Sequence, residues 1–214
     1  MVCRVYLVRH GETIWNAESR YQGHTDVPLS DRGREQARRL SRRLAGQRYH
    51  AVYASSLVRA AETAEIIAAP HGLEVVRLPA LKEINFGAWE GLTRDEIIRF
   101  FGPLYDAWWQ RPLTTRLPDG ESYADVVERS WGALREIVRR HAGQQVLVVS
   151  HGGVIRALVG RILGMDLNQF WRLRQDNGAL NILDFFDENR GVLVLFNDCS
   201  HLEDCRTPAP AWVR

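Results

Sequence analysis

One short apolar run, Gln-Val-Leu-Val-Val at residues 145–149, constrains the fold most strongly. A strand without polar alternation is buried on both faces, which is typical of a parallel sheet covered by helices. Similar runs lie at residues 5–8, 51–54 and 73–78, with helical patterns after Ser30, over 57–69, after Ser122 and up to Gly164. Strands that alternate with helices of this length indicate βαβ units. The predicted fold class is α/β, a three-layer α/β/α sandwich around a mostly parallel sheet.

The last part of the chain adds two strand-like runs, at residues 179–186 and 192–196. The residues between them, Asp187-Glu188-Asn189-Arg190-Gly191, are typical of a hairpin turn. Residues 81–118 carry scattered glycines and prolines and are expected to be irregular. No linker, repeat or low-complexity segment divides the sequence. We therefore expect a single domain over residues 1–214, with an irregular tail from about residue 206.

Composition excludes several classes of protein. The 28 Lys and Arg residues nearly balance the 26 Asp and Glu residues, and the net charge of +2 argues against a nucleic-acid partner. No apolar run approaches the ~20 residues that span a bilayer, and the first residues lack the features of a signal peptide. The three cysteines, Cys3, Cys199 and Cys205, form no disulfide framework. We expect a cytoplasmic protein without a membrane partner, and its oligomeric state stays open.

Two histidines follow strand-like runs with the same local sequence. His10 comes after residues 5–8 and precedes a glycine, and His151 comes after residues 145–149 and precedes Gly152. Ligands of open α/β sheets bind beyond the carboxyl ends of the strands. The glycine lets a ligand approach the backbone, and a following helix directs free N–H groups at an anion. The pair predicts a ligand site that includes Gly152.

Two arginines are expected at the same edge of the sheet. Arg9 precedes His10, and Arg59 lies in the first turn of the helix that follows residues 51–54. Guanidinium groups bind phosphoryl oxygens through charge-assisted hydrogen bonds. No HExxH, CxxC or acidic cluster has the spacing of a metal site. The pattern therefore predicts phosphoryl transfer to a histidine nucleophile, with no metal and no other cofactor.

These residues belong to a longer ordered set of sequence blocks. The blocks are Leu7-Val8-Arg9-His10-Gly11-Glu12-Thr13 with Trp15-Asn16; Gly23-His24-Thr25-Asp26-Val27-Pro28-Leu29-Ser30 with Gly33 and Gln36-Ala37; Ser55-Ser56-Leu57-Val58-Arg59-Ala60-Ala61-Glu62-Thr63-Ala64; Lys82-Glu83; Phe86-Gly87-Ala88-Trp89-Glu90-Gly91; Pro118-Asp119-Gly120-Glu121-Ser122; and Ser150-His151-Gly152-Gly153-Val154. The set continues to Asn197-Asp198 and His201-Leu202. In this order it resembles the histidine phosphatase superfamily, the phosphoglycerate mutase-like proteins. An Arg-His-Gly triplet alone is a weak signal, whereas the ordered set spans nearly the whole chain.

The resemblance implies a phosphoglycerate mutase-like fold and a role for each matching residue. His10 attacks phosphorus in line and becomes a phosphohistidine. Arg9, Arg59 and His151 hold the phosphoryl oxygens and stabilise the charge of the transferring group. Asn16 adds a hydrogen bond to the phosphate. The substrate it implies is a small phosphorylated metabolite.

The same resemblance makes Glu83 the general acid for the leaving alcohol and then the base for the attacking water. Two other carboxylates, Glu90 and Glu12, compete with it for this role. Gln22 and Gly23 are expected to border the phosphate site, although a purely structural role in a loop is equally compatible with the sequence.

Three functions remain open within this resemblance. About 35 residues separate Glu83 from Pro118, which is shorter than the insertion of cofactor-dependent phosphoglycerate mutases. The block Phe86-Gly87-Ala88-Trp89-Glu90-Gly91 resembles that of broad-specificity and α-ribazole phosphatases. We therefore expect a phosphomonoester phosphatase; the alternatives are a phosphoglycerate mutase and a catalytically silent phosphate-ester sensor.

Other side chains have simpler interpretations. The aromatic residues Tyr105, Trp108 and Trp109 are expected in the core rather than against a substrate, and residues 94–117 as a loop above the phosphate. The arginines of the first helix are expected to form a solvated face; they are Arg32, Arg34, Arg38, Arg39, Arg42 and Arg43. The group Cys199, His201, Asp204 and Cys205 contains metal-ligand types, but the resemblance makes it an ordinary closing segment.

Overall fold

A computed structural model describes residues 1–203 and 205 of the chain. Its strands are β1 (Cys3–Arg9), β2 (Ala51–Ser55), β3 (Val75–Leu78), β4 (Gln145–Ser150), β5 (Leu180–Asp187) and β6 (Arg190–Asp198). In this part of the chain they form one six-stranded sheet in the order β3-β2-β4-β1-β5-β6. The first four strands in that order are parallel, β5 is antiparallel to β1, and β6 is antiparallel to β5. The predicted mostly parallel sheet and its final hairpin are confirmed.

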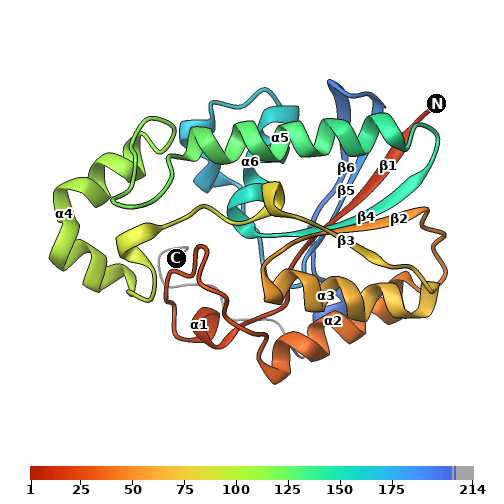
Figure 1. Ribbon diagram of the computed structural model, residues 1–214, viewed down its shortest axis with the longest axis horizontal. Helices are drawn as coiled ribbons and strands as arrows, with labels where there is room; N and C mark the ends of the chain where they lie inside the picture. Colours follow the sequence, from red (N-terminus) through yellow and green to blue (C-terminus); the bar gives the residue numbers. More distant parts are fainter. Residues whose placement is uncertain (204, 206–214) are drawn as a thin grey trace.

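Helices cover both faces of the sheet (Figure 1). The helices α2 (Asp31–Leu44) and α3 (Val58–Ala68) lie on one face, and α5 (Tyr123–Arg140) and α6 (Gly152–Ile162) lie on the other. The predicted three layers are therefore present. Shorter elements connect them: α1 (Ile14–Ala17), η1 (Ala69–His71), η2 (Pro79–Leu81), η3 (Gly87–Trp89), η4 (Leu167–Arg172) and η5 (Ser200–Leu202).

The central strand β4 explains the unbroken apolar run. Val146 and Val148 pack into the core beneath α5 and α6, whereas Leu147 and Val149 pack into the core beneath α2 and α3. All four side chains are fully buried. Successive side chains of a strand point to opposite faces, so a strand that is covered twice needs apolar residues at every position.

The helices begin at the expected capping residues. Ser30 precedes α2, and its hydroxyl accepts a hydrogen bond from the backbone N–H of Gly33 over 3.0 Å. Ser122 precedes α5, and the carboxylate of Asp125 accepts a hydrogen bond from its backbone N–H over 2.8 Å. Both contacts satisfy donors that a helix start leaves without partners.

The segment that was expected to be irregular contains a helix, α4 (Arg94–Gln110), so the prediction of a loop over residues 94–117 is wrong for most of its length. The helix is broken at Phe101, which has a non-helical φ of −133°. Pro103 follows two residues later, and because it has no backbone N–H it cannot continue the helical hydrogen bonds. This break obscured the helical periodicity in the sequence.

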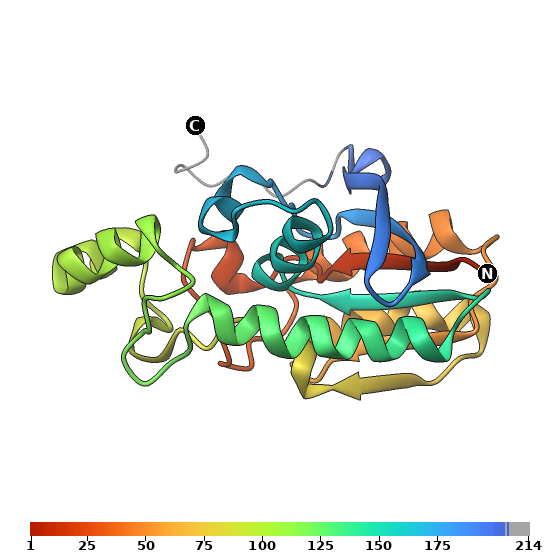
Figure 2. The ribbon, with the colours of Figure 1, turned by 90° about the horizontal axis from the view of Figure 1, so that it is seen from above.

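The aromatic residues of α4 have different environments. Tyr105 and Trp108 are buried beside Trp89, as predicted for core residues. Trp109 is 36% exposed, so the prediction of a core position is wrong there. α4 lies beyond the end of the sheet, and its buried aromatic residues extend the core that α5 and α6 form with the sheet (Figure 2).

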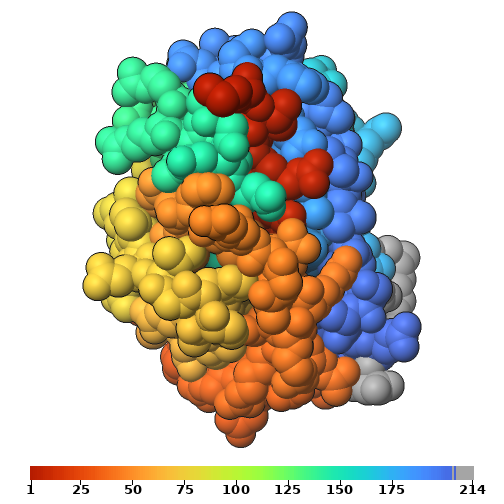
Figure 3. Space-filling view, turned by 90° about the vertical axis from the view of Figure 1, so that its right-hand side faces the viewer, coloured from red at the N-terminus to blue at the C-terminus, as the bar shows by residue number. Residues whose placement is uncertain are grey.

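The opposite end of the molecule is where β1 begins. The first residues of the chain lie there between the segment after α5 and the last hairpin (Figure 3). Met1 packs so near Gly143 that a Cβ on the glycine would lie 3.0 Å from the methionine Sδ. Within residues 1–203 and 205, no helix is both long and apolar enough to cross a membrane. The predicted irregular tail falls beyond the described residues.

Candidate active site

The two predicted histidines meet where β1 and β4 end side by side. Arg9, the last residue of β1, is paired with Ser150, the last residue of β4. The backbone N–H of His10 donates to the carbonyl of Ser150 over 3.0 Å, which joins the two strand ends. The rings of His10 and His151 consequently lie close together, with their centroids 5.0 Å apart.

A cavity of about 750 Å³ opens beside these strand ends. Eight of the nine sequence-predicted site residues line it: Arg9, His10, Asn16, Gln22, Gly23, Arg59, Glu83 and Gly152. The ninth, His151, is fully buried against His10. The structure therefore brings all of them to one place from segments that are distant in sequence.

The ring of His10 presents a basic nitrogen to this cavity. Its Nδ1 lies 2.7 Å from the carbonyl oxygen of Gly11, and because that oxygen only accepts, Nδ1 carries the proton. Burial, and then the positive charges of Arg59 and Arg9, hold the pKa of His10 well below its usual value. The imidazole is therefore neutral at physiological pH, with a lone pair on Nε2.

Arg9 and Arg59 are both anchored through their terminal nitrogens. Arg9 Nη1 donates to the carbonyl of Gln175 over 2.5 Å, and Arg59 donates to the carbonyls of Thr25 and Gly23 over 2.9 and 2.7 Å. Burial lowers the pKa of each arginine to about 10, so both keep their charge at neutral pH. These contacts fix the planes of both guanidinium groups.

The ring of His151 is held by a contact with Ser55. Its Nε2 lies 2.7 Å from the hydroxyl of Ser55, and burial holds its pKa well below the usual value. When the hydroxyl donates to Nε2 of this neutral ring, the ring proton is on Nδ1. His151 then offers Nδ1–H as a donor toward the strand ends.

Three buried donors at the strand ends share one feature. Arg9 Nε, Arg59 Nε and His151 Nδ1 have no hydrogen-bond partner within residues 1–203 and 205. A buried donor without a partner costs about 1–3 kcal/mol, and more when it is charged. A bound tetrahedral anion has enough acceptor oxygens to satisfy several such donors. The arrangement is therefore suited to a phosphoryl group beside His10.

The side chain of Glu83 contacts the first turn of α6. Its Oε2 accepts a hydrogen bond from the backbone N–H of Gly153 over 3.0 Å, and its Oε1 accepts one from Ile84 over 3.0 Å. Glu83 lines the same cavity as Arg9 and Arg59. The carboxyl group can therefore exchange a proton with a ligand held by these arginines.

The two competing carboxylates have other partners. Glu90 accepts hydrogen bonds from the backbone N–H groups of His24, Thr25 and Phe86, and it holds their loops together. Glu12 lines the cavity, but its Oε1 accepts from the hydroxyl of Ser30 over 3.0 Å. Glu83, by contrast, accepts a hydrogen bond from the first turn of α6.

The amide side chains of the first loop complete one wall. Asn16 Oδ1 accepts hydrogen bonds from Thr13 and from Asn177 Nδ2, each over 3.1 Å, so its amide nitrogen is left for the cavity. Gln22 Oε1 accepts from the hydroxyl of Thr13 over 2.9 Å. Gly23 has a φ of +55°, and a Cβ there would lie 2.0 Å from Glu90 Oε1. The loop that carries Gln22 therefore requires glycine at this turn.

Sequence reasoning missed residues that line the cavity from the segment before β5 and from α6. Asn177 donates to the carbonyl of His10 over 3.2 Å as well as to Asn16. Arg156 lies one turn after Gly152 on α6, and its Nε donates to the carbonyl of Leu173 over 2.7 Å. The Asn177-Gly178 pair before a strand was an available signal for a tight turn; Arg156 had no signal beyond its spacing of four residues from Gly152.

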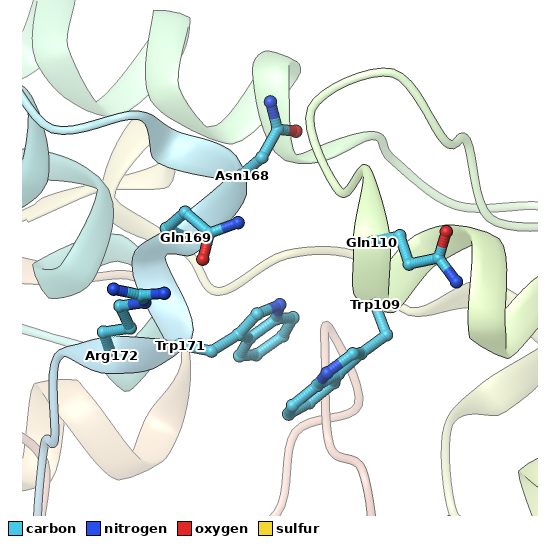
Figure 4. Close-up of a pocket in the computed structure, with 6 residues that line it drawn as sticks. All are labelled: Trp109, Gln110, Asn168, Gln169, Trp171 and Arg172. Carbon is cyan, nitrogen blue, oxygen red and sulfur yellow. The ribbon is translucent and has the colours of Figure 1, made fainter.

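A second cavity, of about 500 Å³, lies where α4 meets η4 (Figure 4). The indole rings of Trp109 and Trp171 are stacked there, with centroids 4.7 Å apart and planes 10° apart. Trp171 and Arg172 line both cavities, so the two are adjacent. The stack connects α4 to the wall of the larger cavity.

The closing segment does not form a metal-binding cluster in the described part of the chain. Cys199 is buried, and His201 Nε2 lies 3.1 Å from the carbonyl oxygen of Gly178. Asp204, which was considered with them, lies outside the described residues.

The chain is similar to several known proteins. The family model of the histidine phosphatase superfamily (branch 1) matches residues 5–199. Phosphoserine phosphatase 1 of Hydrogenobacter thermophilus is 36% identical over 93% of this chain and 94% of its own. Phosphoglycerate mutase-like protein 4 of Arabidopsis thaliana is 39% identical over 94% of this chain and 87% of its own. The structure of Bacillus stearothermophilus YhfR is 37% identical, with a TM-score of 0.88 over 94% of this chain and 100% of that one. The chain belongs to the histidine phosphatase superfamily.

Proposed function

We propose that this protein is a phosphomonoesterase that hydrolyses a small phosphorylated metabolite through a phosphohistidine on His10, without a metal. The observation that carries the proposal is the set of buried donors around His10, namely Arg9 Nε, Arg59 Nε and His151 Nδ1, which have no partner among the described residues. Donors of fixed direction stabilise the charge of a transferring phosphoryl group.

The first step forms the covalent intermediate. The lone pair of His10 Nε2 attacks phosphorus as the bond from phosphorus to the ester oxygen breaks. Arg9, Arg59 and His151 donate to the three non-bridging oxygens, and Asn16 adds a donor. The carboxylic acid of Glu83 gives its proton to the leaving oxygen, so that a neutral alcohol departs.

The second step releases phosphate. Glu83, now a carboxylate, takes a proton from a water molecule whose oxygen attacks phosphorus. The phosphorus–nitrogen bond breaks and its electron pair returns to His10 Nε2. Inorganic phosphate leaves, and both side chains are back in their starting protonation states.

The test is hydrolysis of p-nitrophenyl phosphate by the purified protein in the presence of EDTA. We expect turnover that is abolished in His10→Ala and retained in His50→Ala, because His50 is exposed and does not line the cavity. Brief incubation with a ³²P-labelled monoester should leave an acid-labile, base-stable label on His10. Label on a serine or an aspartate would refute the mechanism.

Two other results would replace the proposed function. Interconversion of 3- and 2-phosphoglycerate that needs 2,3-bisphosphoglycerate would show a mutase, a name that one of the relatives above carries. Binding of phosphate esters without any turnover would show a sensor. A panel of phosphorylated metabolites, ranked by kcat/KM, identifies the substrate.

A further inference from the structure

Arg129, in α5, makes an unusually complete set of contacts. Its Nε and Nη2 donate to the two carboxylate oxygens of Glu121, each over 2.9 Å. Its remaining N–H groups donate to three carbonyl oxygens, those of Ala80 over 2.9 Å, Lys82 over 2.6 Å and Glu83 over 2.8 Å. A guanidinium group has five N–H donors, and here each has a partner.

The carbonyls that Arg129 binds belong to the segment that carries Glu83. Ala80 lies in η2, and Lys82 and Glu83 follow it in the stretch before η3, which pairs with no strand within the described part of the chain. Glu121 adds two more contacts, because its backbone N–H donates to the carbonyl of Asn85 and its Oε2 accepts from the N–H of Asn85, each over 2.9 Å. We call Arg129 and Glu121 together the clamp.

Both side chains of the clamp are largely buried. The side chains of Arg129 and Glu121 are only 21% and 20% exposed. His24, in the loop that also carries Gln22 and Gly23, places its Nε2 2.9 Å from the carbonyl oxygen of Glu83. The backbone of Glu83 is therefore fixed from α5 and from the wall of the cavity.

We propose that Arg129, through the clamp, is a positioning residue for Glu83, setting its carboxyl group at the distance and direction needed to protonate the leaving oxygen. The proposal rests on the proposed function of Glu83 as general acid. Displacement of a catalytic group by about 1 Å can reduce a rate by about 10²-fold. Arg129 itself touches no part of the substrate, since it does not line the cavity.

If Arg129 positions Glu83, the loss of rate in an Arg129 variant depends on the leaving group of the substrate. Protonation by Glu83 matters for an ester whose alkoxide is a poor leaving group, and matters little for p-nitrophenolate, which departs without a proton. A general loss of fold would reduce both reactions together. The dependence of the rate on the leaving group therefore separates positioning of Glu83 from a purely structural role.

The experiment compares p-nitrophenyl phosphate with benzyl phosphate, which carries a ring of similar size on an alkoxide. The variants are Arg129→Ala and Arg129→Lys, with Glu83→Gln as the reference for loss of the acid. Arg135→Ala is the matched control, because Arg135 is also in α5 and pairs with Glu188 at the surface. We measure kcat/KM, which reports the steps up to formation of the phosphohistidine, and the midpoint of thermal unfolding.

We expect Arg129→Ala to lower kcat/KM for benzyl phosphate about 10- to 100-fold, and for p-nitrophenyl phosphate less than 3-fold. A lysine ammonium keeps the charge but cannot bind all five acceptors of the planar guanidinium group. Arg129→Lys should therefore also lose more activity on benzyl phosphate than on p-nitrophenyl phosphate, with smaller losses than Arg129→Ala. Millimolar guanidinium should restore part of the benzyl phosphate activity of Arg129→Ala. Arg135→Ala should behave as wild type.

The outcomes distinguish the inference from the function on which it rests. Equal losses on both esters in the folded Arg129→Lys variant, or no loss on either, would overturn the positioning role. If Glu83→Gln itself does not discriminate between the two esters, the proposed role of Glu83 fails. Turnover that survives in His10→Ala removes the phosphohistidine mechanism altogether.

Discussion

The backbone N–H of Gly153 donates to Oε2 of Glu83 over 3.0 Å, and a Cβ at position 153 would lie only 2.3 Å from Oε1 of the same carboxyl group. Glycine thus serves two purposes at the start of α6: its N–H orients the carboxyl group, and its missing side chain provides the space that the group occupies. Tyr123 adds support, because its hydroxyl donates to the carbonyl of Gly153.

Gly153→Ala should therefore impair catalysis without unfolding the protein. Alanine forms a helix more readily than glycine, and the group that must move is the flexible end of Glu83. We expect kcat/KM for benzyl phosphate to fall about 10- to 100-fold, because the acid is displaced. Gly132→Ala is the control: a Cβ there meets nothing within 4 Å, so it should stabilise α5 and leave activity unchanged. Full activity of Gly153→Ala would show that the contact does not position Glu83.

The accuracy of the sequence-based predictions depended on how local each signal was. β4 was recognisable because burial on both faces leaves no polar position in it, as Val146 and Leu147 illustrate. α4 was not recognisable, because its break at Phe101, two residues before Pro103, interrupts the helical periodicity.

The residues of the site also differ in how far their local sequence reveals them. His10 and His151 could be found because each directly follows a strand and precedes a glycine. Arg129 could not be found, because an arginine in an amphipathic helix has the same local sequence whether it faces solvent or clamps a distant segment. Its partners, Ala80 and Lys82, are 49 and 47 residues away in sequence. Only the packing of α5 against η2 brings them together.

Arg59→Lys should abolish most of the activity although it preserves the charge. The two terminal nitrogens of Arg59 bind the carbonyls of Thr25 and Gly23, and its buried Nε has no partner among the described residues, so we assign Nε to the phosphoryl group. A lysine ammonium cannot hold both carbonyls and also reach the phosphoryl oxygens. Loss of one such donor lowers kcat by about 10²- to 10³-fold.

Two measurements check this expectation. One is kcat/KM on p-nitrophenyl phosphate, and the other is inhibition by vanadate, which should weaken in parallel because vanadate occupies the position of the phosphoryl group. Arg38→Lys serves as the control, since Arg38 is exposed on α2 and pairs with Glu35. Wild-type inhibition by vanadate in Arg59→Lys would contradict the assignment of Arg59 to the phosphoryl group.

The neutral state of His10 has a consequence for stability at low pH. Burial and the charges of Arg59 and Arg9 hold its pKa in the folded protein well below the value of 6.5 for an exposed histidine. Between the two values, the unfolded chain binds a proton that the folded chain excludes. The free energy of unfolding therefore falls as the pH drops below about 6.5, by about 1.4 kcal/mol per pH unit for one histidine, and is unaffected by this group above it.

His10→Asn removes this titration, so urea denaturation between pH 8 and pH 5 should show a smaller loss of stability in the variant than in the wild type. The difference in slope below pH 6 should approach one proton, or about 1.4 kcal/mol per unit. His151→Asn should reduce the slope in the same direction, because burial also holds the pKa of His151 well below its usual value. Parallel curves for wild type and His10→Asn would mean that His10 takes up its proton over the same pH range in the folded and the unfolded protein, which would contradict the lowered pKa.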